Sequence, residues 1–170
     1  PSVANGVTGL KPTWGRVSRH GAFELAASLD HLGPMCRSAA DCGLMLGAIA
    51  GADPDDPTAL QVAMPDYLAG DSQRLTGLRV GIDEAYVAND VASEVADAVH
   101  AALRSLVALG ATPVAVTMPE VDPVVDAWVP HCGVEAAVAH AATFPARRAE
   151  YGPMLADLLD VGLALSATDY

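Results

Sequence analysis

Lys11, the single lysine of the chain, is the residue with the clearest capacity for chemistry. A lysine whose pKa is lowered by burial can act as a base, and Ser–Lys pairs supply nucleophile and base in some hydrolases. Thr8, Thr13 and Ser18 lie near it in the sequence as candidate nucleophiles. The sequence GLKP around Lys11 is typical of a tight turn, however, where a lysine usually donates hydrogen bonds to loop carbonyls. We therefore expect a structural role for Lys11.

Two neighbouring residues, His131 and Cys132, suggest a cysteine nucleophile with a histidine base. Adjacent residues on a helix point about 100° apart, so these side chains cannot easily share a proton. We expect Cys132 to be a small core residue instead. The other histidines are not spaced as metal ligands with any carboxylate pattern: His20, His31, His100 and His140.

The acidic sequence ADPDDP contains Asp53, Asp55 and Asp56 and could bind calcium. It lacks the glycine and the final glutamate of an EF-hand loop, and its prolines indicate a rigid turn with solvated carboxylates. Asp30 and Arg37 flank a Gly-Pro pair and could form an ion pair across a turn. Four other acidic residues are expected to be solvated: Glu84, Asp97, Glu135 and Asp157. These patterns predict no catalytic residue, metal ligand or cofactor in the chain, and they leave the substrate-binding residues unknown.

The first 37 residues are rich in turn sequences, and the first long regular element follows them. Ser38 and Asp41 have the spacing of a capping box, which predicts a helix that runs through Ala50 and ends at Gly51. The sequence CGLMLGAIA in this helix is apolar on nearly every face, which predicts burial on several sides.

A βαβ unit is predicted over residues 78–117. Leu78–Ile82 and Thr112–Thr117 are expected to be its strands, and Asn89 or Asp90 is expected to cap the helix between them. A helix between two strands implies that the strands are parallel. One stripe of apolar residues marks the helix at helical spacing: Val91, Val95, Val99, Ala102, Leu103, Leu106 and Leu109.

Two more helices are predicted, at Cys132–Thr143 and Pro153–Leu163. Ser166 and Asp169 repeat the capping-box spacing just where the chain stops. The chain also starts on Pro1, in the middle of turn sequence. We therefore expect both ends to be internal to a longer protein.

The composition limits the class of protein. The chain has 170 residues, of which 52% are hydrophobic, and a net charge of −12. This charge repels nucleic acid and anionic lipid. The longest stretch without charged residues, 105–119, is broken by a glycine and two prolines and is too short to span a bilayer. The odd cysteine number (Cys36, Cys42 and Cys132) favours a reduced, cytoplasmic protein without disulfides or a zinc site.

The opening segment resembles a known family. Residues 6–18 read GVTGLKPTWGRVS, followed by HG at 20–21, SLD at 28–30, GPM at 33–35, then Arg37 and Asp41. This order is similar to the second part of the amidase signature. The similarity is dense over residues 1–57 and continues more weakly over residues 75–170, which contain the βαβ unit and the following helices. The resemblance implies a partial amidase domain over residues 1–170, within an α/β/α layered fold that has a mixed sheet.

The resemblance also implies an activity for the complete protein. Members of the family hydrolyse or transfer carboxamides with a triad of serine, cis-serine and lysine. Pro1 matches the last residue of the family's nucleophile motif, so the resemblance places all three triad residues before residue 1. Neither Lys11 nor Ser2 is then catalytic. Two segments are expected to form part of the pocket wall: Gly21–Leu25 and Trp128–His140.

Three functions remain open from the sequence. The first is a fragment of a carboxamide hydrolase that is inactive by itself. The second is the A subunit of a glutamyl-tRNA amidotransferase, although HGAFELAASLDHLGP reads more like a general amidase. The third is a non-catalytic, amidase-derived binding or structural module. For the complete enzyme we expect a small-molecule amide substrate and a homodimer, with neither nucleic acid nor membrane as a partner.

Overall fold

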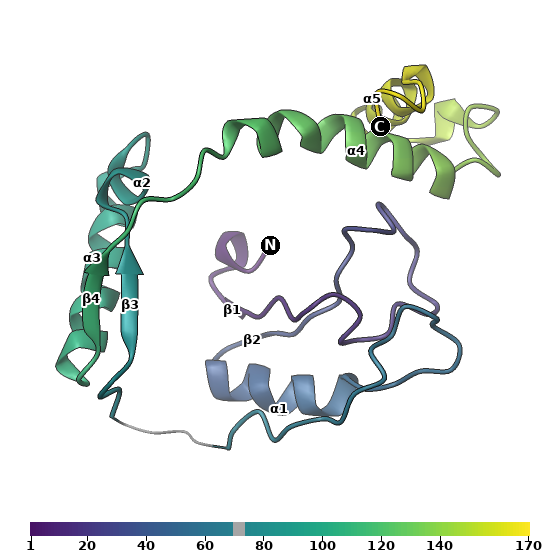
Figure 1. Cartoon of the computed structure of the whole chain (residues 1–170). Coiled ribbons are helices and arrows are strands. Elements are labelled where there is room, and N and C mark those ends of the chain that lie inside the picture. Colours follow the sequence, from purple (N-terminus) through teal and green to yellow (C-terminus); the bar gives the residue numbers. More distant parts are fainter. Residues whose placement is uncertain (70–73) are drawn as a thin grey trace. The chain divides into compact units, whose positions relative to one another are not determined.

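The computed structural model describes residues 1–69 and 74–170, which fold as a mixed α/β protein (Figure 1). The chain divides into two structural units. The first unit comprises Pro1–Ala69 and Asp122–Tyr170, and the second comprises Gly70–Val121. The first unit is therefore assembled from two stretches that are far apart in the sequence.

The amino-terminal part of the first unit contains little regular structure, as its turn-rich sequence predicts. A short 3-10 helix, η1 (Val3–Asn5), precedes strand β1 (Thr8–Gly9). Strand β2 (Met35–Cys36) pairs antiparallel with β1, with Thr8 opposite Cys36. Long loops connect these short strands, so side-chain hydrogen bonds must hold much of this region in place.

Helix α1 (Ala39–Ile49) begins at the predicted capping residue. The Ser38 hydroxyl accepts a hydrogen bond of 3.1 Å from the Asp41 amide, and the helix ends before Gly51, which has a φ of +145°. Burial on several sides was the wrong expectation for this chain. One face is buried through Cys42, Gly43 and Leu46, whereas Leu44 and Met45 lie exposed.

Two long helices form the carboxyl-terminal part of the first unit. Helix α5 (Pro153–Ala164) confirms the predicted helix and has proline in its first turn. Helix α4 (Asp122–Ala139) differs from the prediction because it starts ten residues before Cys132 and ends four before Thr143. Pro130 lies inside it. A proline removes one helical hydrogen bond but keeps a helical φ, and this helix continues through it.

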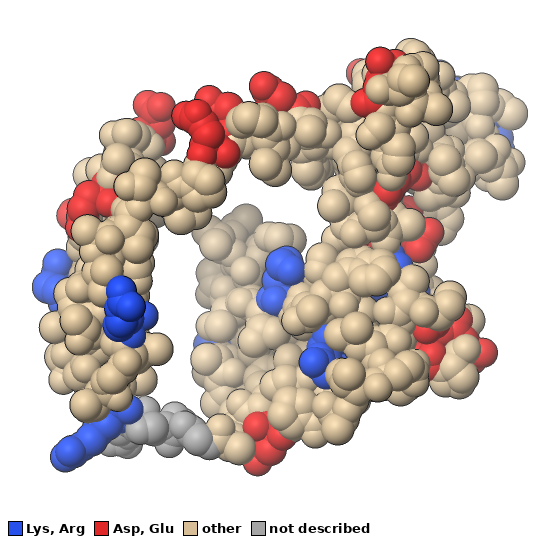
Figure 2. Space-filling model, viewed as in Figure 1, with Lys and Arg blue, Asp and Glu red and all other residues tan. Residues whose placement is uncertain are grey.

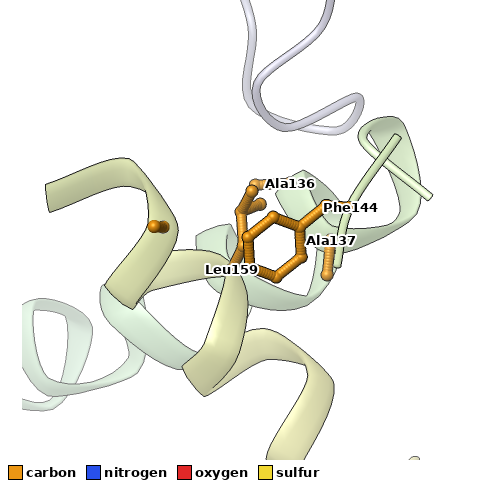
Figure 3. Close-up of a cluster of buried hydrophobic side chains, with 5 residues drawn as sticks. Ala136, Ala137, Phe144 and Leu159 are labelled. Carbon is orange, nitrogen blue, oxygen red and sulfur yellow. The ribbon is translucent and has the colours of Figure 1, made fainter. Parts of the chain in front are cut away.

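Helices α4 and α5 pack closely around a buried apolar cluster. Phe144 and Leu159 fill the space between the two helices, together with small side chains from both (Figure 3). Leu159 is completely buried and Phe144 is 4% exposed. Gly133 and Gly162 let the two backbones approach closely, since a Cβ added to Gly162 would lie only 1.9 Å from the Gly133 carbonyl oxygen. The two helices therefore form a hairpin in which Gly133 and Gly162 touch where the helices cross.

Besides α4 and α5, this part of the unit holds a short 3-10 helix, η2 (Arg148–Glu150).

The second unit confirms the predicted βαβ arrangement. Strands β3 (Arg79–Ile82) and β4 (Thr112–Ala115) are parallel, with Arg79 opposite Thr112. Helix α3 (Ser93–Ala108) lies between them in the sequence and beside them in Figure 1. Its apolar stripe is only partly covered, because Val95 and Val99 remain 55% and 39% exposed.

The start of α3 corrects the predicted cap. Asp83 caps an additional helix, α2 (Glu84–Ala88), by accepting hydrogen bonds from the Ala85 and Tyr86 amides. Asn89 follows that helix, and Asp90 takes a left-handed conformation with a φ of +55°. Neither residue caps α3. The turn between the two helices uses Asp90, since aspartate tolerates this conformation better than most residues.

Two further expectations concern the charge of the surface and the capping-box spacing of Ser166 and Asp169. Acidic side chains spread over the face drawn in Figure 2, as the net charge of −12 implies. Ser166 and Asp169 are joined by the Ser166 amide, which donates to the Asp169 carboxylate at 2.8 Å, half of a capping box. Among the helices of residues 1–69 and 74–170, none has both the length and the apolar character needed to cross a membrane.

Candidate functional site

A buried arginine holds the loop that follows the signature segment. The side chain of Arg19 is 8% exposed, and its guanidinium lies 4.9 Å from the centre of the Trp14 ring. It donates to the Ala27 carbonyl and, at 3.1 Å, to the Thr58 hydroxyl, and it lies 3.6 Å from Glu24. Arg19 therefore links the loop at residues 20–28 to the acidic segment around Thr58.

The carboxylate of Asp56 completes this link. It accepts the Arg19 amide at 2.7 Å, the Thr58 amide at 2.8 Å and the Thr58 hydroxyl at 2.6 Å. Asp56 is buried, so the expectation that the ADPDDP carboxylates are solvated was wrong at this position. Donation by the Arg19 amide and by the Thr58 hydroxyl lowers the pKa of Asp56 to about 2. Asp56 is a charged anchor for backbone amides.

We expect the contribution of Asp56 to stability to depend on pH. Its pKa is lowered from 3.8 to about 2 on folding, so the contribution is complete above about pH 4 and is lost as the pH falls toward about 2. Asp56→Asn should lower the urea midpoint at neutral pH, and the difference from the parent chain should shrink across that acidic range. Urea unfolding at several pH values measures this. A difference that stays constant down to about pH 2 would contradict the assignment.

A second polar cluster joins three distant parts of the first unit. The Ser28 amide donates to Glu135 Oε2 at 2.9 Å, and the Tyr170 hydroxyl donates to Glu135 Oε1 at 2.6 Å. His131 lies one turn before Glu135 on α4, and its ring stacks on Tyr170 with centroids 5.0 Å apart. Glu135 thus holds the SLD segment and the carboxyl terminus against α4, and its expected solvation was wrong.

The cluster combines serine, histidine and glutamate but lacks the geometry of a catalytic triad. In a triad the two ring nitrogens of histidine contact different partners, the nucleophile and the acid. Here Ser28 Oγ and Glu135 Oε1 both contact Nε2 of His131, at 2.8 and 3.3 Å. The glutamate therefore cannot orient the ring for proton transfer from the serine. This arrangement favours a positioning role.

The charge states in this cluster follow from its contacts. Burial by itself would raise the pKa of Glu135, but hydrogen bonds from Tyr170 and Ser28, with the nearby His131, lower it overall. Burial raises the pKa of the Cys132 thiol, and the carboxylates of Asp30 and Glu135 raise it further. Cys132 is 1% exposed. These properties match the predicted core residue and oppose a reactive thiolate.

We expect Tyr170 to report the Glu135 contact directly. Its hydrogen bond to Glu135 raises the pKa of Tyr170 above the ordinary value of 10.0. Glu135→Gln removes the charge, so the pKa should fall toward that value. Absorbance titration of the phenols, with Tyr170→Phe subtracted, measures the change. Glu94→Gln on α3 is the matched control and should leave the titration unchanged, whereas an unchanged titration in Glu135→Gln would contradict the contact.

The remaining predicted residues lie apart from one another. Lys11 is exposed, and its Nζ donates to the Pro12 carbonyl at 3.3 Å, as a turn lysine is expected to do. Ser18 donates to Asp53 at 2.6 Å, which lowers the pKa of that carboxyl. Thr8 lies in β1, and neither it nor Ser18 contacts Lys11 through any hydrogen bond of the described residues. No Ser–Lys pair forms there.

Several other charged and histidine side chains have partners of their own. His100 contacts Glu84 at 2.8 Å, and Arg148 contacts Asp157 at 3.0 Å, so these two acids are paired. Asp30 accepts the Leu25 amide at 2.8 Å instead of forming the expected ion pair with Arg37. Across residues 1–69 and 74–170, no group of three or more histidine, cysteine, aspartate or glutamate side chains is arranged to hold a metal ion.

The two segments expected to form a pocket wall do meet. The ring of Phe23, from Gly21–Leu25, lies 4.9 Å from the ring of His140 at the end of α4, and a cavity of about 280 Å³ opens beside them. Sequence spacing gave no sign of the Ser28–His131–Glu135 cluster, because its partners are up to 107 residues apart. The turn that contains Asp53, Asp55 and Asp56 was recognisable from its prolines, but the burial of Asp56 was not.

The described residues form a mixed α/β fold, and comparison with known proteins identifies the family. A model of the Amidase family matches residues 1–163, so the chain belongs to the amidase family. A solved structure from a vestigial protein complex, described in connection with the origins of an s-triazine catabolic enzyme, has a TM-score of 0.85 and 28% identity over 97% of this chain and 35% of that chain. The fold is that of amidase-signature enzymes.

Two curated relatives show the range of the family. AmiD of Mycobacterium tuberculosis strain H37Rv, which is named as an amidase, is 44% identical over the whole chain. The A subunit of the glutamyl-tRNA(Gln) amidotransferase of Pseudomonas aeruginosa strain PAO1 is 43% identical over 75% of the chain. The chain spans 35% of the length of AmiD and 26% of the length of the Pseudomonas protein.

Proposed function

We propose that this chain is a partial amidase domain of a carboxamide hydrolase, an enzyme that converts an acyl amide to a carboxylate and ammonia or an amine. The observation that carries the proposal is the family match over residues 1–163, supported by the identity to AmiD over the whole chain. In such an enzyme a serine attacks the amide carbonyl, the amine leaves, and water releases the acyl group. Residues 1–57 and 75–170 would form the two parts of the domain.

We further propose that the chain supplies scaffold and pocket wall and is inactive alone. Two features support this. Lys11, the single lysine, is exposed and bonded to a loop carbonyl, and His131 contacts Ser28 and Glu135 through the same ring nitrogen. Neither arrangement activates a serine. The triad of the resemblance would come from sequence outside this chain. The three free cysteines and the acidic surface agree with a cytoplasmic enzyme that has a small-molecule substrate.

A transferase is the second candidate function. The identity of 43% to the A subunit of a glutamyl-tRNA(Gln) amidotransferase favours it, but that similarity covers 75% of the chain, whereas the similarity to AmiD covers all of it. The hydrolase therefore has the stronger support.

The experiment compares the 170-residue chain with a longer protein that contains it. A serine-directed fluorophosphonate should label the longer protein and leave the chain unlabelled. Ammonia release from simple carboxamides, without tRNA or a partner protein, should occur only with the longer protein. Stoichiometric labelling of the chain would refute the proposed position of the nucleophile. Ammonia release that requires a glutamyl-tRNA acceptor would favour the transferase.

A further inference from the structure

We propose that the sulfur atoms of Cys36, Cys42 and Met45 form a binding site for a soft monovalent cation such as Cu⁺. The three residues come from two elements of the first unit, strand β2 and helix α1, which pack against each other next to β1 (Figure 1). We call these residues the sulfur cluster. The cluster has no part in the polar contacts described above, and the inference does not depend on the proposed amide hydrolysis.

The fold brings the three side chains of the sulfur cluster to one place. Cys42 and Met45 are three residues apart on α1, so they lie on the same face of the helix. Cys36 lies on β2 opposite Thr8, and the Cys42 thiol contacts the Thr8 carbonyl at 3.5 Å. The Cys36 thiol donates to Sδ of Met45 at 3.7 Å. This face of α1 therefore meets the strand through its sulfur atoms.

The two thiols of the cluster also interact with each other. Burial raises the pKa of the Cys36 thiol above its ordinary value of 9.0, and a hydrogen bond between the Cys36 and Cys42 side chains raises it further. The nearby carboxylate of Asp41 adds to this shift of the pKa. Negative charge that opposes a thiolate favours a cation at the same place. Both cysteines are free, so both sulfur atoms are available as ligands.

The spacing and the chemical type of the donors fit a soft metal ion. Metal–sulfur bonds of about 2.3 Å in a three- or four-coordinate site place neighbouring sulfur atoms about 3.8–4.0 Å apart. The distance of 3.7 Å between the Cys36 and Met45 sulfur atoms is close to that value. Thiolate and thioether ligands together select Cu⁺, whereas structural zinc sites use a full set of thiolate and imidazole ligands. The third donor here is a thioether, so the cluster differs from the groups of histidine, cysteine and carboxylate side chains excluded above.

The cluster is closed on one side and open on the other. Cys42 is completely buried, Cys36 is half-buried, and Met45 is 46% exposed. This order of exposure provides an entry path that starts at Met45 and leads to the thiols. A bound Cu⁺ would replace the protons of the two thiols, which pass to the solvent, and no electron is transferred. The Ser38 cap fixes the start of α1, so the helix already holds two of the three donors in place.

Competition for Cu⁺ tests the site in the 170-residue chain without requiring activity. The chain is mixed, in the absence of oxygen, with the coloured complex of Cu⁺ and bicinchoninate, and the loss of colour measures transfer of the metal to the protein. We expect the chain to take about one equivalent of Cu⁺. Met45→Leu keeps the side-chain volume but removes the sulfur, so it should weaken binding at least about tenfold, and Cys36→Ser should weaken it further. Met154→Leu in α5 is the matched control and should have no effect, since Met154 is 88% exposed and lies on another helix.

Four results would overturn the inference. They are the absence of Cu⁺ transfer, unchanged affinity in Met45→Leu, an equal loss of affinity in Met154→Leu, and displacement of Cu⁺ by an equal amount of Zn²⁺. The circular dichroism spectra of the variants should match that of the parent chain, because Leu has nearly the volume of Met and the Met45 side chain is half exposed. Amide hydrolysis is not measured in this experiment, so its outcome decides this inference and leaves the proposed function to its own test.

Discussion

Gly162→Ala is expected to destabilise the first unit by about 3 kcal/mol or more, because the methyl group would overlap the backbone of the facing helix. The added Cβ would lie 1.9 Å from the Gly133 carbonyl oxygen and 2.3 Å from its carbon. Backbone atoms cannot rotate away as a flexible side chain can. Helices α4 and α5 would have to separate, and the packing between Phe144 and Leu159 would loosen. Chemical denaturation followed by circular dichroism measures the change.

The matched control is Gly47→Ala in α1. A Cβ there would meet only a Tyr67 ring carbon at 4.0 Å. Alanine is favoured over glycine inside a helix by about 1 kcal/mol, so this variant should be as stable as the parent or slightly more stable. Equal effects of the two substitutions would show that the close crossing of α4 and α5 does not exist in solution.

Arg19→Met is expected to cost about 2–4 kcal/mol of unfolding free energy, because hydrogen bonds from a buried charged group are lost. Methionine keeps a long apolar side chain at this buried position but removes the guanidinium that lies over the Trp14 ring. It leaves the Ala27 carbonyl and the Thr58 hydroxyl without the guanidinium. The loop that presents Phe23 should then become mobile. Urea unfolding gives the free energy, and amide exchange at Ala22 and Leu25 reports the loop.

Arg79→Met provides the control for Arg19→Met. Arg79 is exposed on β3, in the second unit, so its replacement should change stability by less than about 0.5 kcal/mol. If Arg19→Met were equally mild, Arg19 would be a surface residue in solution, and the anchoring of the loop would need another cause.

The parts of the fold that the sequence predicted are those determined by local signals. Ser38 and Asp41 interact across three residues, and Pro153 marks the start of a helix at its own position. The βαβ unit follows from two short strand patterns on either side of an amphipathic helix. In each case the residues that cause the structure lie within one segment, so their spacing suffices to predict it.

The errors have physical reasons that lie in an unrecognised local cap and in long-range contacts. Asp83 caps the additional helix α2, which ends at Ala88 and is followed by Asn89, so the expected cap of α3 at Asn89 or Asp90 was wrong and α3 begins after Ala92. The partners that bury Asp56 and Glu135 are 37 and up to 107 residues away, beyond any local pattern. A charged residue looks solvated in a sequence until its distant donors are known. The cavity beside Phe23 and His140 was not predictable from local spacing, because its rings come from separate segments.

The hydrogen bond between Ser28 and Glu135 has a consequence for the order of folding. It spans 107 residues, and the whole second unit lies within the loop that it closes. Closing a longer loop costs more chain entropy, so contacts between neighbouring residues form first. During synthesis the Ser28 amide can form this bond only after α4 has been made, which is long after the residues around Ser28. The amino-terminal segment is thus completed only after α4 has been made.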